Sequence, residues 1–243
     1  MIQIEVKGLG TALKSIGVDL PKQTRYATMV ALTRTASKVR DRQYSEMHRV
    51  FDRPTPYTLR AIRVKPATKS DLSAWVGFKK PWAARAEEYM PSQVEGGGRP
   101  LKALELFLQQ RVTTMSPQGK RGAYPKGTYF VPGRGARLDA YGNMSRGQVQ
   151  QILSALQAHT DRLQNETVRS RKRAKRTVRY WATQRGIWEI KGQSMLMALV
   201  AVKRKPLYSK RYPFYEISRR FVGEIWPGEF DRAFAKALAT ARS

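Results

Sequence analysis

The chain has 243 residues, and 41% of them are hydrophobic, which is enough for a folded core. Its 46 Lys and Arg against 18 Asp and Glu give a net charge of +28, which destabilises a compact isolated monomer and attracts nucleic acid, anionic membranes or acidic protein surfaces. The complete lack of cysteine excludes disulfides, thiolate catalysis and Cys-based zinc sites.

The N-terminal part of the sequence predicts a strand and then a long helix. Residues 2–6 alternate apolar and polar side chains, as half-buried strands do. Asp19 is a suitable N-cap, and Pro21 suits the first helical turn, where a missing N–H costs little. The helix then continues for about eight turns, until the prolines of residues 52–56 end it. Its apolar face consists of Met29, Leu32, Ala36, Val39, Met47 and Val50.

The middle of the chain predicts a hairpin, a break and a second helix. Residues 62–65 and 74–78 alternate in polarity and can pair as antiparallel strands across the polar stretch 68–71. Three glycines at 96–98 indicate a flexible break. Leucines at helical spacing then predict a helix that begins near Pro100.

The second half predicts a loop, three strands and two helices. Residues 116–127 are rich in Gly, Pro and Lys and indicate a loop, whereas 128–131 indicates a strand. Ser145-x-x-Gln148 matches a capping box that opens a helix. Two further strands, 187–190 and 194–203, are expected around a Lys-Gly turn. The second is apolar on both faces, which predicts a place inside its sheet. A last helix is expected to begin near Pro227.

These elements predict an α+β fold in which a small antiparallel sheet packs against a long N-terminal helix and a C-terminal helix, with extended arms or loops. We expect a single domain over residues 1–243, with residues 161–179 as a basic linker or arm, because that segment has no apolar face wide enough to be buried. Five side chains serve as markers of the core: Leu32, Val39, Leu153, Val200 and Phe234.

Positive charge is the main chemical signal of the sequence. Between Arg169 and Arg211 there are fourteen basic residues and one acidic residue, Glu189. Like charge at such a density repels itself unless something neutralises it. Phosphate contact, a solvated arm and an arm paired with acidic surfaces of neighbouring subunits all remain open, because charge alone does not identify its partner. The candidate contact residues for nucleic acid or an acidic partner are Arg169, Arg171, Lys172, Arg173, Lys175, Arg176 and Arg179.

Aromatic residues are interleaved with this charge. Stacking on unpaired bases is one possible use, but core packing and subunit anchoring are commoner, and we favour them. The sequence lacks an RNP-like strand, a GXXG loop and a zinc finger, so sequence-specific readout of nucleic acid is not expected. The aromatic residues are Tyr180, Trp181, Trp188, Tyr208, Tyr212, Phe214 and Tyr215.

No local motif predicts catalysis, a cofactor or a metal. The histidines, His48 and His159, are far apart in the sequence. The adjacent residues Glu87 and Glu88 would point about 100° apart on a helix and do not face each other. Residues 133–136 contain two glycines but lack the Gly-Lys-Ser/Thr ending of a phosphate loop, so we interpret them as a turn. We therefore expect no enzymatic activity.

The longest apolar run, residues 195–202, has eight residues, whereas a membrane span needs roughly 20. The first residues also lack the basic and apolar regions of a secretory signal. We therefore expect no membrane span and synthesis in a cytoplasm.

Three segments resemble the minor tail protein Z and related tail-completion proteins of long-tailed phages. The first is the helix ATMVALTRTASKVRDR with its exit DRPTPYTLRAIRVKPAT, and the second is RGARLDAYGNMSRGQVQQILSAL. The third is the ending KPLYSKRYPFYEISRRFVGEIWPGEFDRAFAKAL, in which a basic Tyr-rich strand leads into a closing helix. The run 161–179 lies outside the resemblance.

The resemblance implies a structural virion protein that acts in tail completion or head–tail joining, made in the host cytoplasm and located in the tail or neck. Its partners would be other tail or neck proteins and, non-specifically, phage DNA. Tails and necks are built on closed rings, so a homo-oligomeric ring around the DNA channel is expected. The alternative is a free, non-sequence-specific nucleic-acid-binding protein, such as a packaging or ribosome-associated factor.

Overall fold

The structure is a computed structural model, and it confirms an α+β fold with a long N-terminal helix and a C-terminal helix. The residues described are 2–5, 21–79, 89–116, 119–173 and 178–241. Asp19 and Val6 lie outside them.

The contacts within the chain group it into two compact units, and the single domain over residues 1–243 that the sequence predicts stays a prediction. Unit 1 comprises residues 1–96 and 209–243, and unit 2 comprises residues 97–208. The buried apolar residues form separate clusters in the two units. The glycines at 96–98, which the sequence predicts to be a flexible break, lie where the chain leaves unit 1.

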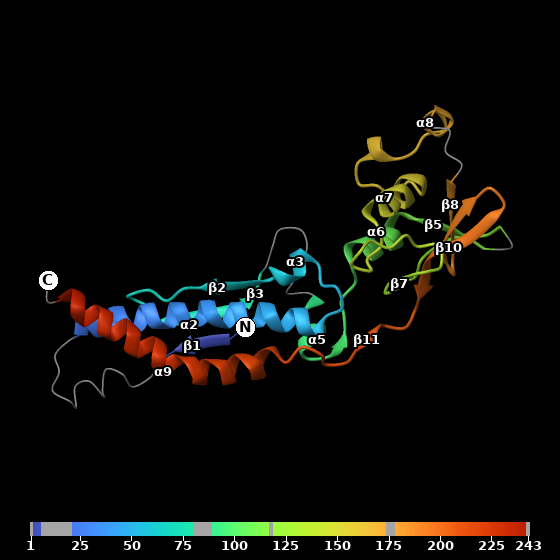
Figure 1. Cartoon of the computed structure of the whole chain (residues 1–243). Helices are drawn as coiled ribbons and strands as arrows, with labels where there is room; N and C mark the ends of the chain where they lie inside the picture. The colour runs from blue at the N-terminus through green and yellow to red at the C-terminus, as the bar shows by residue number, and fades with distance from the viewer. Residues whose placement is uncertain (1, 6–20, 80–88, 117–118, 174–177, 242–243) are drawn as a thin grey trace. The chain divides into compact units, whose positions relative to one another are not determined.

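Unit 1 is organised around two long helices, α2 (Pro21–Val50) and α9 (Phe214–Ala241), which lie side by side (Figure 1). The start of α2 packs against the end of α9, so the helices are antiparallel. Small side chains let the two backbones approach closely there. The residues at this contact are Ala27, Ala31, Ala233 and Ala237. The predicted apolar face of α2 is confirmed, because Leu32, Ala36, Val39 and Met47 are fully buried.

A three-stranded antiparallel sheet completes unit 1. It consists of β1 (Ile2–Glu5), β3 (Ser73–Phe78) and β2 (Ile62–Lys65), in that order. The predicted hairpin is confirmed, with Ile62 opposite Phe78. Between α2 and β2, the short helix α3 (Pro56–Leu59) begins at Thr55, whose hydroxyl accepts a hydrogen bond from Thr58 N at 3.1 Å. A second short helix, α5 (Pro91–Val94), precedes the exit from unit 1.

The last helix begins at Phe214, and the expectation of a start near Pro227 is wrong. Pro227 lies inside α9, where a proline removes one helical hydrogen bond at a cost of about 3 kcal/mol. Burial on both sides of it, at Phe214 and Ala233 for example, holds the helix against α2 across the proline. Figure 1 shows α9 changing direction along its length, as helices that contain proline do.

Unit 2 contains a six-stranded mixed sheet. Only the β5–β8 pair is parallel. The predicted pair β9–β10 is confirmed, and β10 lies inside the sheet, between β9 and β7. The segment expected to be a loop at 116–127 instead contains β6, which pairs antiparallel with β5. In order across the sheet, the strands are β6 (Arg121–Ala123), β5 (Thr113–Met115), β8 (Val178–Thr183), β9 (Gly186–Lys191), β10 (Ser194–Val202) and β7 (Tyr129–Pro132).

Two helices, α6 (Ala103–Arg111) and α7 (Arg146–Ala155), lie on one side of this sheet (Figure 1). Leu108 of α6 and Ile152 of α7 are fully buried in the core of the unit. Among the core markers, Leu32, Val39 and Leu153 are buried, and Val200 and Phe234 are partly buried. None of the helices in the described ranges is long and apolar enough to cross a membrane.

The remaining elements of unit 2 are short. The expected flexible break at 96–98 is in part a strand, because β4 (Gly97–Gly98) pairs with β11 (Leu207–Tyr208). The segment expected to be an arm contains η1 (Arg162–Gln164) and α8 (Val168–Arg173), and its last two residues already belong to β8.

Candidate polyanion and partner interface

The seven basic residues selected from the sequence do not form one uniform arm. Arg179 is exposed on β8, and Arg169 and Lys172 are exposed on α8. Arg179 belongs to the sheet because its neighbours in β8, Tyr180 and Ala182, pack into the core of unit 2. Lys175, Arg176 and the side chains of Arg171 and Arg173 lie outside the described residues.

Unit 2 carries most of the excess positive charge, with 22 Lys and Arg against five Asp and Glu. Its acidic side chains serve local structure. Glu105 forms a buried ion pair with Arg99, with atoms 2.6 Å apart. Asp139 accepts hydrogen bonds from the backbone N–H groups of Tyr141 and Asn143, both at 2.9 Å. These carboxylates cannot neutralise the exposed cations, so the unit presents uncompensated positive charge.

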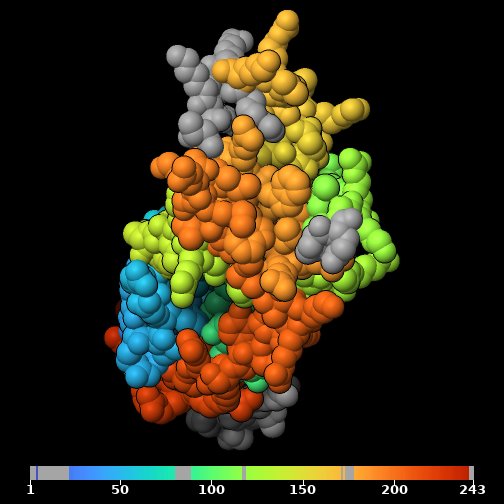
Figure 2. Space-filling model, turned by 90° about the vertical axis from the view of Figure 1, so that its right-hand side faces the viewer, coloured from blue at the N-terminus to red at the C-terminus, as the bar shows by residue number. Residues whose placement is uncertain are grey.

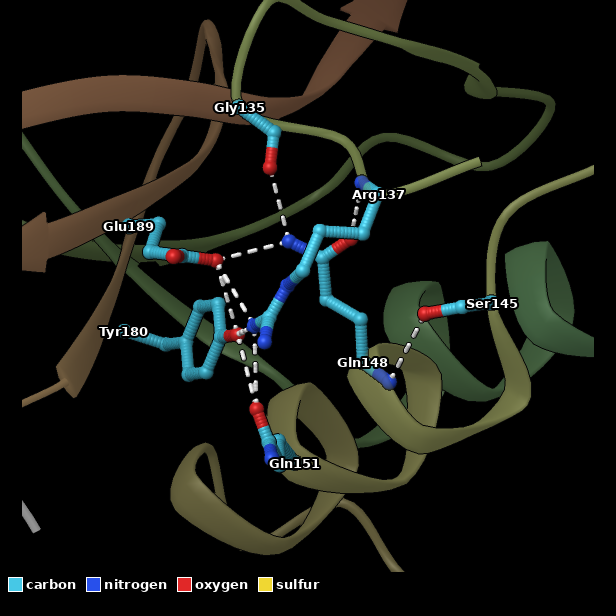
Figure 3. Close-up of polar contacts among 7 residues, drawn as sticks. All are labelled: Gly135, Arg137, Ser145, Gln148, Gln151, Tyr180 and Glu189. Atoms are coloured by element: carbon cyan, nitrogen blue, oxygen red, sulfur yellow. Dashed lines mark hydrogen bonds and ion pairs between the residues drawn. The ribbon is translucent and has the colours of Figure 1, made fainter. Parts of the chain in front are cut away.

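Glu189, the one acidic residue between Arg169 and Arg211, faces α7 (Figure 3). One carboxylate oxygen accepts hydrogen bonds from Gln148 Nε2 at 2.7 Å, Tyr180 Oη at 2.9 Å and Arg137 Nη2 at 3.1 Å. Its charge is therefore balanced by Arg137 within the unit and is not available to the basic run.

Glu189 and its three donors, Gln148, Tyr180 and Arg137, form what we call the Glu189 cluster. The capping box predicted at Gln148 is only half formed. Ser145 Oγ accepts a hydrogen bond from Gln148 N at 3.4 Å, as expected for an N-cap. The Gln148 side chain is buried and points away from the helix start: it donates to Gly135 O at 2.7 Å and accepts from Arg137 N at 2.6 Å. It therefore ties the loop before α7 to the sheet.

The Glu189 cluster is a structural clamp. Burial, followed by the hydrogen bond and negative charge of Glu189, raises the pKa of Tyr180 to about 12, so its hydroxyl stays protonated at neutral pH and donates. A nucleophile needs an adjacent base to activate it, and here the carboxylate is already engaged by three donors. We assign the cluster no chemistry of its own.

The turn at 133–136 is confirmed, and two of its backbone N–H groups donate hydrogen bonds within unit 2. The backbone N–H groups of Gly133 and Gly135 donate to Ala198 O at 3.0 Å and Met197 O at 2.8 Å, alongside β10. A Cβ at Gly133 would lie 2.2 Å from Met197 O, which explains the glycine. Because these N–H groups are bonded to β10, they cannot cradle a phosphate.

We call the side of the sheet that faces away from α6 and α7 the open face. It carries large exposed side chains. Trp181 lies opposite Trp188, and Trp188 lies opposite Met197, so these three side chains share one face. Met195 is 56% exposed and Trp181 47%. In Figure 2, β8 to β10 (orange) are seen at the surface with no helix in front of them. The open face consists of Arg179, Trp181, Trp188, Met195, Met197 and Val200.

The aromatic residues singled out from the sequence have different environments. Tyr212 and Phe214 are fully buried in unit 1, as the core-packing interpretation requires. Trp181 is exposed, so core packing does not explain it. The signal in the sequence for an exposed Trp181 is the alternation of β8, in which Tyr180 points inward and Trp181 outward. It could not be used, because the sequence does not say which face the helices cover.

Both histidines make contacts with side chains of their own unit. The His48 ring packs edge-on against Tyr44 with centroids 4.9 Å apart, and His159 Nε2 lies 2.5 Å from Gln150 Oε1. Within the described part of the chain, no group of three or more His, Asp or Glu side chains is placed to hold a metal ion. Glu87 and Glu88 lie outside that part.

In comparisons with known proteins, the chain matched no family model, no curated protein sequence and no solved structure.

Proposed function

We propose that the chain is a non-enzymatic structural protein of a tailed-phage virion, acting in tail completion or head–tail joining as a ring of identical subunits around the DNA channel. The resemblance of its three segments to minor tail protein Z and related proteins suggests this role. Its partners would be other tail or neck proteins, with non-specific contact to phage DNA.

The observation that carries the proposal is the pairing of uncompensated charge with an apolar sheet face in unit 2 that is exposed in the described part of the chain. A monomer gains nothing from either feature: the charge repels itself, and exposed Trp and Met side chains are hydrated at a cost. Both become favourable when neighbouring molecules cover the face and neutralise the charge. A subunit of a larger assembly therefore accounts for the surface better than a free monomer does.

Deletion of the gene tests the role. We expect capsids that package DNA but give non-infectious particles with defective or unjoined tails, as seen by electron microscopy. A mass-spectrometric inventory of purified virions and of headless tails should contain the wild-type chain. Empty, unpackaged heads as the main product would contradict the proposal and favour a packaging role.

The second candidate function is non-specific binding of nucleic acid by the free protein. The excess of 22 Lys and Arg over five Asp and Glu in unit 2 favours it. Such a protein loses affinity steeply with salt, and it would not remain in particles purified at high salt. Retention in such particles therefore separates the two functions.

A further inference from the structure

The open face has the composition of a protein–protein interface. Such interfaces are enriched in aromatic residues, Met and Arg and are depleted of Lys, Glu and Asp. None of the side chains that β8, β9 and β10 direct to this face is Lys, Glu or Asp, although unit 2 as a whole is rich in Lys. The two tryptophans, two methionines and one arginine therefore differ from the rest of the surface.

The face is also built to receive a partner. Trp188 Nε1 donates a hydrogen bond to Thr183 Oγ1 at 3.2 Å, which fixes the indole ring before any partner arrives. Trp188 and Met195, together with Arg134 from the neighbouring turn, line a shallow hollow. Hot spots of protein–protein interfaces are often aromatic rings beside a pocket. A ring that is already fixed loses little side-chain entropy on binding.

A second copy of this chain is a poor occupant. Each copy carries a net charge of +28, and the open face adds Arg179, with Arg134 at its border. In a two-fold contact the same patch meets itself, so these guanidinium groups would face each other, and in the head-to-tail contact of a ring they would face another surface of a chain with the same net charge of +28. Such like-charge contacts are unfavourable.

Nucleic acid also fits the centre of the face poorly. Interfaces with DNA are more polar and more positively charged than those between proteins. Here Trp188 of β9 and Met195 and Met197 of β10 lie between Arg179 of β8 and the turn that carries Arg134, and the two methionines offer phosphates no donor. The cations lie at the sides, where they suit carboxylates that surround an apolar contact.

We propose that the open face binds a different protein, through an apolar segment flanked by Asp or Glu side chains that pair with Arg179 and Arg134. This inference rests on the proposed function, which makes the partner a neighbouring tail or neck protein, and it adds the chemistry of that neighbour's surface. Apolar side chains of the partner cover Trp181, Trp188 and Met195.

The test uses headless tails assembled without this chain. Purified wild-type protein is added, then DNA-filled heads, and both the chain retained on the tails and the infectious particles are counted. The variant Trp181→Glu/Met195→Glu places carboxylates on the open face at two exposed positions, so folding should be unaffected; circular dichroism and the melting temperature check this. Leu163→Glu is the matched control, because Leu163 is 93% exposed and lies outside the open face.

We expect the double variant to lose incorporation by about 30-fold or more, the factor typical of an interface hot spot, and Leu163→Glu to behave as wild type. Arg179→Glu should also reduce incorporation, because it would face the partner's carboxylates. A folded double variant that joins tails like wild type would overturn the inference and leave the proposed function intact. If wild type itself is not retained on tails, both fail.

Two parallel measurements distinguish the other occupants. Binding of a single-stranded 20-nucleotide dT oligomer is measured by fluorescence anisotropy, and self-association by sedimentation. We expect the double variant to match wild type in both. A loss of dT binding as large as the loss of incorporation would make the face a base-stacking site, and a loss of wild-type self-association would make it a contact between copies. Either result overturns the inference.

Discussion

Gln43 is a polar residue on the apolar face of α2, and it joins that helix to the start of α9. It is fully buried and uses both ends of its amide. Nε2 donates to Phe214 O at 2.9 Å and to Ser218 Oγ at 2.6 Å, and Oε1 accepts from Tyr212 Oη at 2.6 Å. It lies between Val39 and Met47 in the apolar pattern, so the sequence marks the position as unusual but does not name its partners.

Replacing Gln43 with Leu should destabilise unit 1 by about 2–4 kcal/mol, because a buried hydroxyl and a buried carbonyl lose their partners. Urea unfolding followed by circular dichroism measures the loss. Arg42→Leu is the control, since Arg42 is the preceding residue of the same helix and is exposed. Equal unfolding midpoints for the two variants would show that the Gln43 hydrogen bonds contribute nothing to stability.

Glu105 should make the stability of unit 2 sensitive to acid. Burial alone would raise its pKa, but hydrogen bonds from Arg99 and from the backbone N–H groups of Phe130 and Lys102 outweigh burial and lower it. The stabilisation is fully present above the pKa of an unfolded Glu, about 4.3, and is lost as pH falls through the lower folded value.

The acid effect is measured by melting wild type and Glu105→Gln between about pH 6 and pH 2.5. Wild type should be more stable at pH 6, and the gap should narrow as the pH falls below about 4.3. Asp161→Asn is the control, because Asp161 is exposed. A gap between wild type and Glu105→Gln that stays constant with pH would mean that the Arg99–Glu105 pair does not set the acid response.

At the scale of elements, the basic run 169–179 includes most of α8 and the first two residues of β8. Changing Arg171, Lys172, Arg173, Lys175 and Arg176 to Gln should separate its two possible partners. If the run contacts duplex DNA, neutralising about seven phosphates gives a log–log salt slope near −6. The variant should then flatten that slope and weaken binding equally for all sequences.

If the partner is an acidic protein surface, the same variant should bind DNA as before but fail to incorporate into tails. Arg25, Arg34 and Arg42, which are exposed on α2, provide a control substitution to Gln that removes charge elsewhere. A variant that assembles, infects and keeps its salt slope would show that the run is only a solvated surface.

Local patterns in the sequence are sufficient to predict some of the elements. Alternation predicted the hairpin at 62–78 and the pair β9–β10, and helical spacing predicted α2. The missed elements depend on distant partners: β4 is a strand only because β11 lies beside it, and α9 continues through Pro227 only because α2 packs along both of its parts. The open face was missed for the same reason, since Trp188 and Ile187 are both apolar and only the packing of α6 and α7 distinguishes their faces.

At the scale of the whole molecule, unit 2 is an insertion whose two ends meet. Gly97 is paired with Tyr208, and Gly98 with Leu207, in the two-stranded sheet that opens and closes the unit. On the unit 1 side, the backbone N–H groups of Arg211 and Tyr212 both donate to Gln93 O at 2.9 Å. The chain therefore leaves unit 1 and returns to it at nearly the same place, with a separate cluster of buried apolar residues in each unit.

Both units should consequently fold alone. Residues 97–208 expressed by themselves should melt cooperatively. In a second variant, a Gly-Ser linker of about four residues replaces them, which is enough to span paired Cα atoms about 5 Å apart. This variant should keep unit 1 folded with its α2–α9 pair. Each fragment's dispersed NMR spectrum should superpose on that of the full chain, apart from residues near the junction. A fragment 97–208 that is unfolded in isolation, or a linker variant that loses the cooperative transition of unit 1, would show that each core depends on the other unit and that the single domain expected from the sequence is the better description.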